Sequence, residues 1–334
     1  MSDWIVYVGY VAMVAIVVVL SMKLGKYVDI IDAKSNISGA FIGGVMLAAV
    51  TSLPELFTSL SAIWVVRESS IVIGNILGSD LINLAFFGMI MLVFARGFKK
   101  VKFTPFYCIA LVVALGMYAL TAIGLFFGEY MRIAWYSAVS FAILVLYVLF
   151  LSKMPKTSEK SDDGADENIT LKQALVRFGV CAVVLIGASI CMTYFTDAVA
   201  DKLELGKTFA GALFLGVATS LPELISSITL CKRGNFDAAA GNIVGSNIFN
   251  FTILVVADIL SFMPNTADVY ALNFDSKCLL ILGAIATVAT LAMMILKNSK
   301  KRQRAALFGA QALNCVSPAL YVLYLLLTTA VIVL

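Results

Sequence analysis

Apolar runs of about 20 residues dominate this sequence and constrain its fold more than any other feature. A run of that length crosses the hydrocarbon core of a bilayer as an α-helix, because lipid offers no partner to an unpaired backbone N–H or C=O group. Hydrophobic residues make up 61% of the chain and charged residues only 13%, whereas a typical soluble domain has about 25% charged residues. The sequence therefore predicts an all-α integral membrane protein.

The apolar runs divide into predicted transmembrane spans, five on each side of a polar stretch at residues 152–170. Their approximate ranges are 4–20, 37–65, 71–95, 103–127, 131–151, 173–195, 209–231, 236–262, 278–296 and 308–332. The polar stretch carries mixed charges and cannot bury a core, so it is interpreted as a short linker. The first half then covers residues 1–151 and the second half residues 171–334.

Lysine and arginine are distributed unevenly over the connections between these spans. Of the 24 basic residues, 19 lie in or beside the linker or in loops that follow odd-numbered spans; the other five are Arg67, Arg132, Lys202, Lys207 and Lys277. By the positive-inside rule these loops and the linker are cytoplasmic, and both termini are outside. Span 1 and span 6 then cross in opposite directions. The two halves are therefore predicted to be inverted repeats, typical of secondary transporters with a site near the bilayer midplane.

The sequence TSLPEL occurs at residues 51–56 and again at residues 219–224. The proline of each copy lacks an N–H, so the carbonyl four residues earlier loses its helical partner. Carboxylate, hydroxyl and carbonyl oxygens are the ligands that hard cations such as Ca²⁺ and Na⁺ prefer. A proline kink repaired by hydroxyl groups is the alternative, but it does not explain a glutamate in both copies. Glu55 and Glu223 are therefore interpreted as cation ligands.

A second pair of related segments lies at residues 74–83 and 241–250. Each has polar side chains at positions i, i+4 and i+8, and a GxxxG spacing that predicts close helix packing. The polar side chains could serve either in packing between helices or in cation binding. We interpret four of them as oxygen ligands of a cation: Ser79, Asn83, Ser246 and Asn250. Asp80, whose counterpart is Asn247, either holds a proton, accepts a hydrogen bond from an asparagine or adds charge to the ion pathway.

Together the duplicated motifs resemble the alpha-1 and alpha-2 repeats of the cation/calcium exchanger superfamily, in particular prokaryotic sodium/calcium exchangers. The resemblance covers nearly the whole chain, with the motifs at residues 48–83 and 216–250. It implies an antiporter that exchanges Na⁺ for Ca²⁺ by alternating access, with both ions competing for a midplane site. The positions that match cation-binding residues of the family are Glu55, Glu223, Thr51, Thr219, Ser52, Ser220, Ser79, Ser246, Asn83, Asn250, Ala48 and Gly216. In the family the threonine, Ala48 and Gly216 positions contribute backbone carbonyls, and Asp80 is a further candidate.

One departure from the family pattern concerns charge. Several members have an acid at one of the positions of Asn83 and Asn250, whereas this chain has an amide at both. Glu55 and Glu223 then carry nearly all the charge of the site, and Asp80 is the residue able to compensate.

Two other transport functions remain alternatives to Na⁺/Ca²⁺ exchange. One is an H⁺/divalent cation antiporter on the same scaffold, with a glutamate or Asp80 as the proton carrier; the other is a cation channel. The GNxxE-like motif typical of the H⁺/Ca²⁺ branch is absent from the sequence, which favours Na⁺ coupling.

Several classes of function are not expected. The chain has no histidine and no nucleophile–base pair, so an enzyme is not predicted. Its six cysteines form no CxxC pair, so neither disulfides nor zinc are predicted. We expect a multi-pass protein of the cytoplasmic membrane of a prokaryotic cell, with Ca²⁺ and Na⁺ as substrates and the lipid bilayer around it. No cofactor, nucleic acid or obligate protein partner is expected.

Overall fold

The computed structural model describes most of the chain. The described residues are 3–35, 42–61, 63–64, 70–99, 101, 103, 105–127, 130, 132–133, 136–153, 169–202, 216–261, 269–270, 274–298 and 312–333. In chain order, the elements are α1 (Asp3–Lys34), η1 (Ile42–Leu47), α3 (Ala48–Thr51), α4 (Leu53–Ser61), α5 (Ser70–Val93), α6 (Ala95–Phe98), α7 (Pro105–Phe127), β1 (Arg132–Ile133), β2 (Tyr136–Ser137), α8 (Ala138–Ser152), α9 (Leu171–Lys202), α11 (Gly216–Thr219), α12 (Leu221–Lys232), α13 (Phe236–Leu260), α14 (Phe274–Asn298) and α16 (Val316–Val333). The structure thus confirms the helical class that the apolar runs predict.

Seven helices in the described part of the chain are long and apolar enough to cross a bilayer. They are Trp4–Lys34, Ile42–Leu60, Val72–Val93, Pro105–Phe127, Leu171–Ala188, Phe236–Leu260 and Ser276–Lys297. Two shorter apolar helices, Ala138–Ser152 and Ala312–Leu327, correspond to the predicted spans 5 and 10. The start of the predicted span 7, up to residue 215, lies outside the described residues. The ten-span count and the outside location of the termini therefore stay predictions.

Helix α1 is much longer than the predicted span 1. It continues past residue 20 to Lys34, so the prediction that span 1 ends near residue 20 and is followed by a loop is wrong. The physical reason is an apolar stripe at positions i, i+4 and i+7, formed by Leu24, Val28 and Ile31, which are at most 2% exposed. Packing of this stripe keeps the chain helical where hydropathy alone indicates an end.

The predicted span 5 also begins differently. Residues 132–133 and 136–137 form an antiparallel pair of short strands, with Arg132 opposite Ser137. Helix α8 starts only at Ala138, where Ser137 acts as the N-cap and its hydroxyl accepts a hydrogen bond from the N–H of Val139 at 3.2 Å. The N–H of Ser137 in turn donates to Oδ2 of Asp258 at 2.7 Å. A cap and a buried carboxylate therefore set this helix end.

The chain forms two compact units, and each contains segments from both halves of the sequence. Unit 1 comprises Met1–Pro54, Val93–Val101 and Met154–Ser246, and unit 2 comprises Glu55–Leu92, Lys102–Lys153 and Asn247–Leu334. These units are defined by packing and do not test the predicted repeat halves, which stay a prediction.

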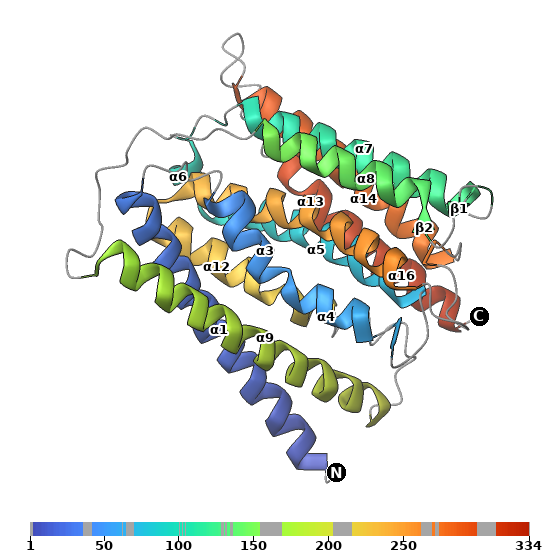
Figure 1. Ribbon diagram of the computed structural model, residues 1–334, viewed down its shortest axis with the longest axis horizontal. Helices are drawn as coiled ribbons and strands as arrows, with labels where there is room; N and C mark the ends of the chain where they lie inside the picture. The colour runs from blue at the N-terminus through green and yellow to red at the C-terminus, as the bar shows by residue number, and fades with distance from the viewer. Residues whose placement is uncertain are drawn as a thin grey trace. The chain divides into compact units, whose positions relative to one another are not determined.

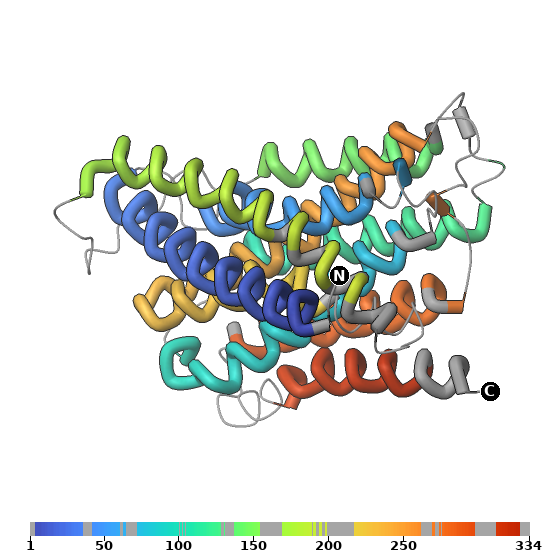
Figure 2. Tube along the Cα trace, turned by 90° about the horizontal axis from the view of Figure 1, so that it is seen from below, coloured from blue at the N-terminus to red at the C-terminus, as the bar shows by residue number. Residues whose placement is uncertain are grey.

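In unit 1, helix α1 lies against α9 and α12, and Figures 1 and 2 show α1 and α9 side by side. At the C-terminal end of α1, Lys34 Nζ donates to the carbonyl of Ile169, just before α9, at 2.6 Å. At its other end, Gly9 faces the ring of Phe195 near the end of α9, and a Cβ added to this glycine would overlap the ring. The two helices are therefore antiparallel, the direction expected for equivalent helices of inverted repeats.

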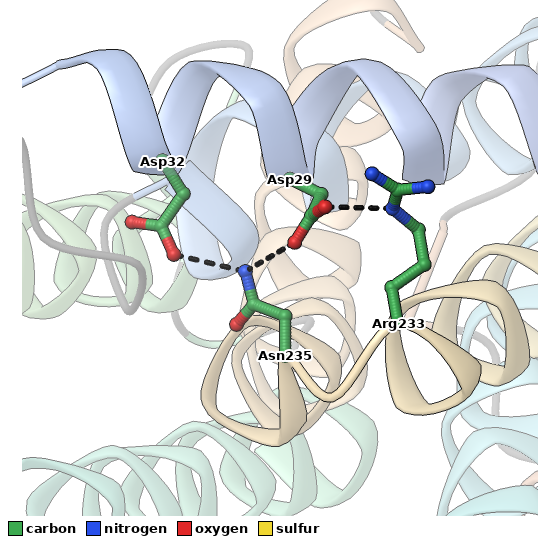
Figure 3. A network of polar contacts seen from close by, with 4 residues as sticks. All are labelled: Asp29, Asp32, Arg233 and Asn235. Atoms are coloured by element: carbon green, nitrogen blue, oxygen red, sulfur yellow. Dashed lines mark hydrogen bonds and ion pairs between the residues drawn. The ribbon is translucent and has the colours of Figure 1, made fainter. Parts of the chain in front are cut away.

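A polar network joins the C-terminal part of α1 to the turn between α12 and α13 (Figure 3). Arg233 Nε lies 2.6 Å from Asp29 Oδ2. Asn235 Nδ2 donates to Asp32 Oδ2 at 2.9 Å and to Asp29 Oδ1 at 3.5 Å. The turn places Gly234 at a φ of 84°, a conformation that glycine adopts without strain. The network fixes this part of α1 to the two helices that carry the second motif copy.

In unit 2, α7 contacts both α8 and α14 (Figure 1), and α14 also packs against α16. The rings of Phe106 in α7 and Phe150 in α8 stack with centroids 5.3 Å apart. Tyr118 in α7 packs edge-on against Phe251 of α13 at 5.0 Å. Aromatic packing thus holds α8 and α13 against α7.

Exposure is distributed as expected for a chain surrounded by lipid. Apolar side chains of α8 are exposed, Phe141 to 58% and Val148 to 55%. Three acidic side chains of the duplicated motifs are buried instead: Glu55 and Asp80 are 0% exposed and Glu223 is 1% exposed. This pattern supports a membrane location, because lipid solvates apolar groups and leaves polar groups to find partners inside the protein.

Helix α13 and the π-helix η1 approach each other closely in unit 1. A Cβ added to Gly245 of α13 would overlap the carbonyl oxygen of Gly44 in η1, and one added to Gly43 would overlap the carbonyl oxygen of Ala238. The GxxxG spacing therefore marks a real close approach at Gly245. At Gly78, the equivalent position of the first copy, an added Cβ meets no described atom within 4 Å.

Gly245→Ala and Gly78→Ala form a matched pair that tests this packing. We expect Gly245→Ala to destabilise the protein by about 1–3 kcal/mol, because its methyl group overfills the contact with η1. Gly78→Ala should have no such effect, since no described atom lies within 4 Å of the added methyl group and alanine is the better helix former. Thermal unfolding of both variants in detergent measures the difference. Equal unfolding midpoints would contradict the close approach.

Candidate functional site

Both copies of the first motif interrupt a helix at the same place. In the first copy, Ser52 separates α3 from α4 with φ −88° and ψ 6°. In the second copy, Ser220 separates α11 from α12 with φ −88° and ψ 2°. Pro54 and Pro222 follow two residues later, and a proline cannot donate the N–H that would continue the helical ladder. The same local sequence therefore produces the same break twice.

The two glutamates lie in the first turn of the helix that follows each break. The positive end of the helix dipole favours a carboxylate there. In unit 2, the hydroxyl of Ser79 donates to Glu55 Oε1 at 3.3 Å. In unit 1, the hydroxyl of Ser52 donates to Glu223 Oε1 at 3.1 Å. Each buried carboxylate thus has a serine hydroxyl from the predicted site as a partner.

Unit 1 brings further residues of both motif copies together. Thr51 Oγ1 donates to the carbonyl of Ala48 at 3.3 Å and lies 3.4 Å from the hydroxyl of Ser246. The Ser246 hydroxyl in turn donates to the Ala48 carbonyl at 3.5 Å. The backbone N–H of Ser52 donates to the same carbonyl at 3.0 Å. Ala48 of the first copy and Ser246 of the second are therefore neighbours.

Unit 2 contains Asp80 and its asparagine partners. Asn250 Nδ2 donates to Asp80 Oδ1 at 2.9 Å, and Asn247 Nδ2 donates to the main-chain carbonyl of Asp80 at 3.0 Å. The structure therefore shows one of the three predicted arrangements of Asp80, the hydrogen bond from an asparagine. Asn83 is also buried, and neither of its amide atoms has a hydrogen-bond partner among the described residues.

The remaining predicted residues of the second copy lie around the break in unit 1. Gly216 begins α11, and Thr219 ends it. Thr219 and Ser220 are both 0% exposed. The structure thus places the predicted residues in the protein interior or at the two helix breaks, and their roles as cation ligands stay predictions.

Two residues outside the predicted set contact the glutamates. Asn75 Nδ2 donates to the main-chain carbonyl of Glu55 at 3.1 Å, and Asn242 Nδ2 donates to that of Glu223 at 3.2 Å. The sequence contained a signal for both, because they are the first members of the polar stripes at i, i+4 and i+8. Sequence reasoning missed their role because they contact the main chain and not the carboxylates.

The family model described as sodium/calcium exchanger protein matches residues 5–153 and 173–332, which is nearly the whole chain. The protein belongs to this family. The superfamily resemblance of the duplicated motifs is therefore confirmed, and the protein is a multi-pass membrane exchanger of the cation/Ca²⁺ antiporter type. The family is one of transporters and not of catalytic enzymes.

Relatives and solved structures resemble this exchanger over most of its length. It is 27% identical over 254 residues to inner membrane protein YrbG of Escherichia coli, covering 73% of this chain and 76% of the relative. It is 28% identical over 272 residues to putative antiporter CaxA of Alkalimonas amylolytica, covering 78% and 80%. A solved structure of the sodium-calcium exchanger NCX_Mj matches with a TM-score of 0.68 at 19% identity, covering 96% of this chain and 98% of that chain. This match shows a common fold.

The pairing of Asp80 with Asn250 is testable by exchange of the two residues. Asn250→Asp places two carboxylates at hydrogen-bond distance, so we expect it to destabilise the exchanger by roughly 1–3 kcal/mol. The double variant Asp80→Asn/Asn250→Asp restores one carboxylate and one amide and should recover most of that loss. Unfolding midpoints in detergent for the two single variants and the double variant give the coupling. A double variant that shows the sum of the two single effects would contradict the pairing.

Proposed function

We propose that the exchanger transports Ca²⁺ against Na⁺ across the cytoplasmic membrane by alternating access, with Glu55 and Glu223 as the Ca²⁺-binding carboxylates. The observation that carries the proposal is the repeated arrangement of a helix break, a buried glutamate in the next turn and a serine hydroxyl on its carboxylate. An ionisable group in a membrane interior is costly and is retained where it handles an ion.

The chemistry of the two copies suits a hard divalent cation. Carboxylate, hydroxyl and carbonyl oxygens are the ligands of Ca²⁺, and they also bind Na⁺. Because the motif is duplicated, we propose that both glutamates bind the transported Ca²⁺, whose double charge they match. Na⁺ ions use the same oxygens, so the two kinds of ion compete and exchange follows.

Further observations support Na⁺ coupling and alternating access. The exchanger shares its fold with NCX_Mj, a protein described as a sodium-calcium exchanger. Its helices break beside both glutamates, and α1 and α9 form an antiparallel pair. In transporters of inverted-repeat architecture, broken helices form the binding site, and alternating access is largely a rigid-body movement of one repeat or bundle against the other.

Na⁺ coupling is tested with purified protein in liposomes loaded with Na⁺ at equal pH on both sides. We expect uptake of radioactive Ca²⁺ to follow the outward Na⁺ gradient and to stop when choline replaces Na⁺. Uptake that follows a pH gradient and ignores Na⁺ would instead identify an H⁺/divalent cation antiporter. Ca²⁺ currents without any counter-ion would identify a channel.

Glu55→Gln and Glu223→Gln test the carboxylates in the same liposomes. Each removes one buried charge while keeping the shape of the side chain, so Na⁺-dependent Ca²⁺ uptake should fall by about 100-fold or more. Glu159→Gln, in the predicted linker, is the matched control and should transport normally. Size-exclusion profiles show whether the variants are folded. Near-normal exchange by both folded variants would rule out the glutamate site.

A further inference from the structure

Two asparagines at equivalent positions of the motif copies make the same kind of contact in different units. In unit 2, Asn75 Nδ2 donates to the main-chain carbonyl of Glu55 and to the hydroxyl of Ser59, both at 3.1 Å. In unit 1, Asn242 Nδ2 donates to the main-chain carbonyl of Glu223 at 3.2 Å. The contact thus occurs twice, once for each glutamate.

Asn242 makes additional contacts in unit 1. Its Nδ2 also lies within hydrogen-bond distance of the hydroxyls of Ser226, at 3.0 Å, and Ser227, at 2.9 Å. Its Oδ1 lies 3.3 Å from Thr51 Oγ1, whose single hydrogen can be donated either to this oxygen or to the Ala48 carbonyl. The single side chain therefore joins α13 to α12, which carries Glu223, and to α3, which carries Thr51.

Both amides are buried, which strengthens their hydrogen bonds. Asn242 is 0% exposed and Asn75 is 8% exposed, and hydrogen bonds in such a low-dielectric interior are stronger than those at a surface. Each one holds the main chain of a glutamate, next to the Cα from which the carboxylate extends. Ser79 lies four residues after Asn75 on the same helix face and holds the Glu55 carboxylate. One face of α5 therefore fixes both ends of this glutamate.

We propose that Asn75 and Asn242 are positioning residues, which hold the glutamates where the carboxylates bind Ca²⁺ without binding the ion themselves. The proposal rests on the proposed transport function. A bound cation tolerates only small displacements of its ligands, so a shift of the glutamate main chain weakens binding. Asn242 has the larger role, because it also holds Thr51 beside the same site.

The test uses the full-length exchanger in liposomes, with variants Asn75→Ala and Asn242→Ala. We expect Asn242→Ala to raise the KM for Ca²⁺ by about tenfold, equivalent to about 1.4 kcal/mol, and Asn75→Ala to raise it less. Asn242→Asp keeps the shape and the acceptor toward Thr51 but replaces the amide donor with an oxygen. It should raise KM at least as much as Asn242→Ala. Ca²⁺ binding to the purified protein should weaken in parallel.

Thr252→Val is the control on α13, because it removes a hydrogen bond to the carbonyl of Phe249 without touching the glutamates. Its KM should match that of the wild type. Variants that lower only the amount of folded protein, with wild-type KM and Ca²⁺ affinity in the remainder, would show a merely structural role and overturn the proposal. If Asn242→Ala does not fold, the KM and Ca²⁺ affinity of Asn75→Ala and Asn242→Asp decide whether the asparagines are positioning residues. A wild-type protein that neither binds nor transports Ca²⁺ would overturn the proposed function as well.

Discussion

A carboxylate inside a lipid-surrounded protein is stable only if the protein supplies its partners, and this constraint organises the interior of the exchanger. The helix breaks before Glu55 and Glu223 place each acid at the start of a new helix, where the dipole favours negative charge. A serine hydroxyl then reaches each carboxylate, and an asparagine amide reaches each glutamate main chain. The helix dipole, the serine hydroxyls and the asparagine amides thus all stabilise Glu55 and Glu223.

The duplicated motifs do not act as separate copies. Within unit 1, Ser52 of the first copy contacts Glu223 of the second, and within unit 2, Asn250 of the second copy contacts Asp80 of the first. The arrangement is symmetric in the helix breaks and asymmetric in charge. Asp80 adds a carboxylate to the first copy, and the amide of Asn250 is its partner. The extra acid therefore lies within hydrogen-bond distance of Asn250 of the second copy.

Much of the fold and part of the site could be predicted from local sequence. Long apolar runs cross a bilayer as helices because their backbone groups must be hydrogen-bonded internally, so the helical class was predictable. Pro54 and Pro222 likewise marked the two helix breaks. The long continuation of α1 was not predictable from hydropathy, because it depends on partners for a narrow apolar stripe. The late start of α8 was missed for a similar reason, since it depends in part on the contact of Ser137 with Asp258, which is distant in sequence.

The sequence by itself determined the membrane-spanning helical class, the family and the residues able to offer oxygen to a cation. These follow from composition and from motifs whose chemistry is local. Only the tertiary structure decided which hydroxyl faces which carboxylate, that Asn250 is the partner of Asp80 and that Asn75 and Asn242 hold the glutamate main chain. Helical spacing shows which side chains share a face. Which atoms lie within hydrogen-bond distance depends on how helices distant in sequence pack together.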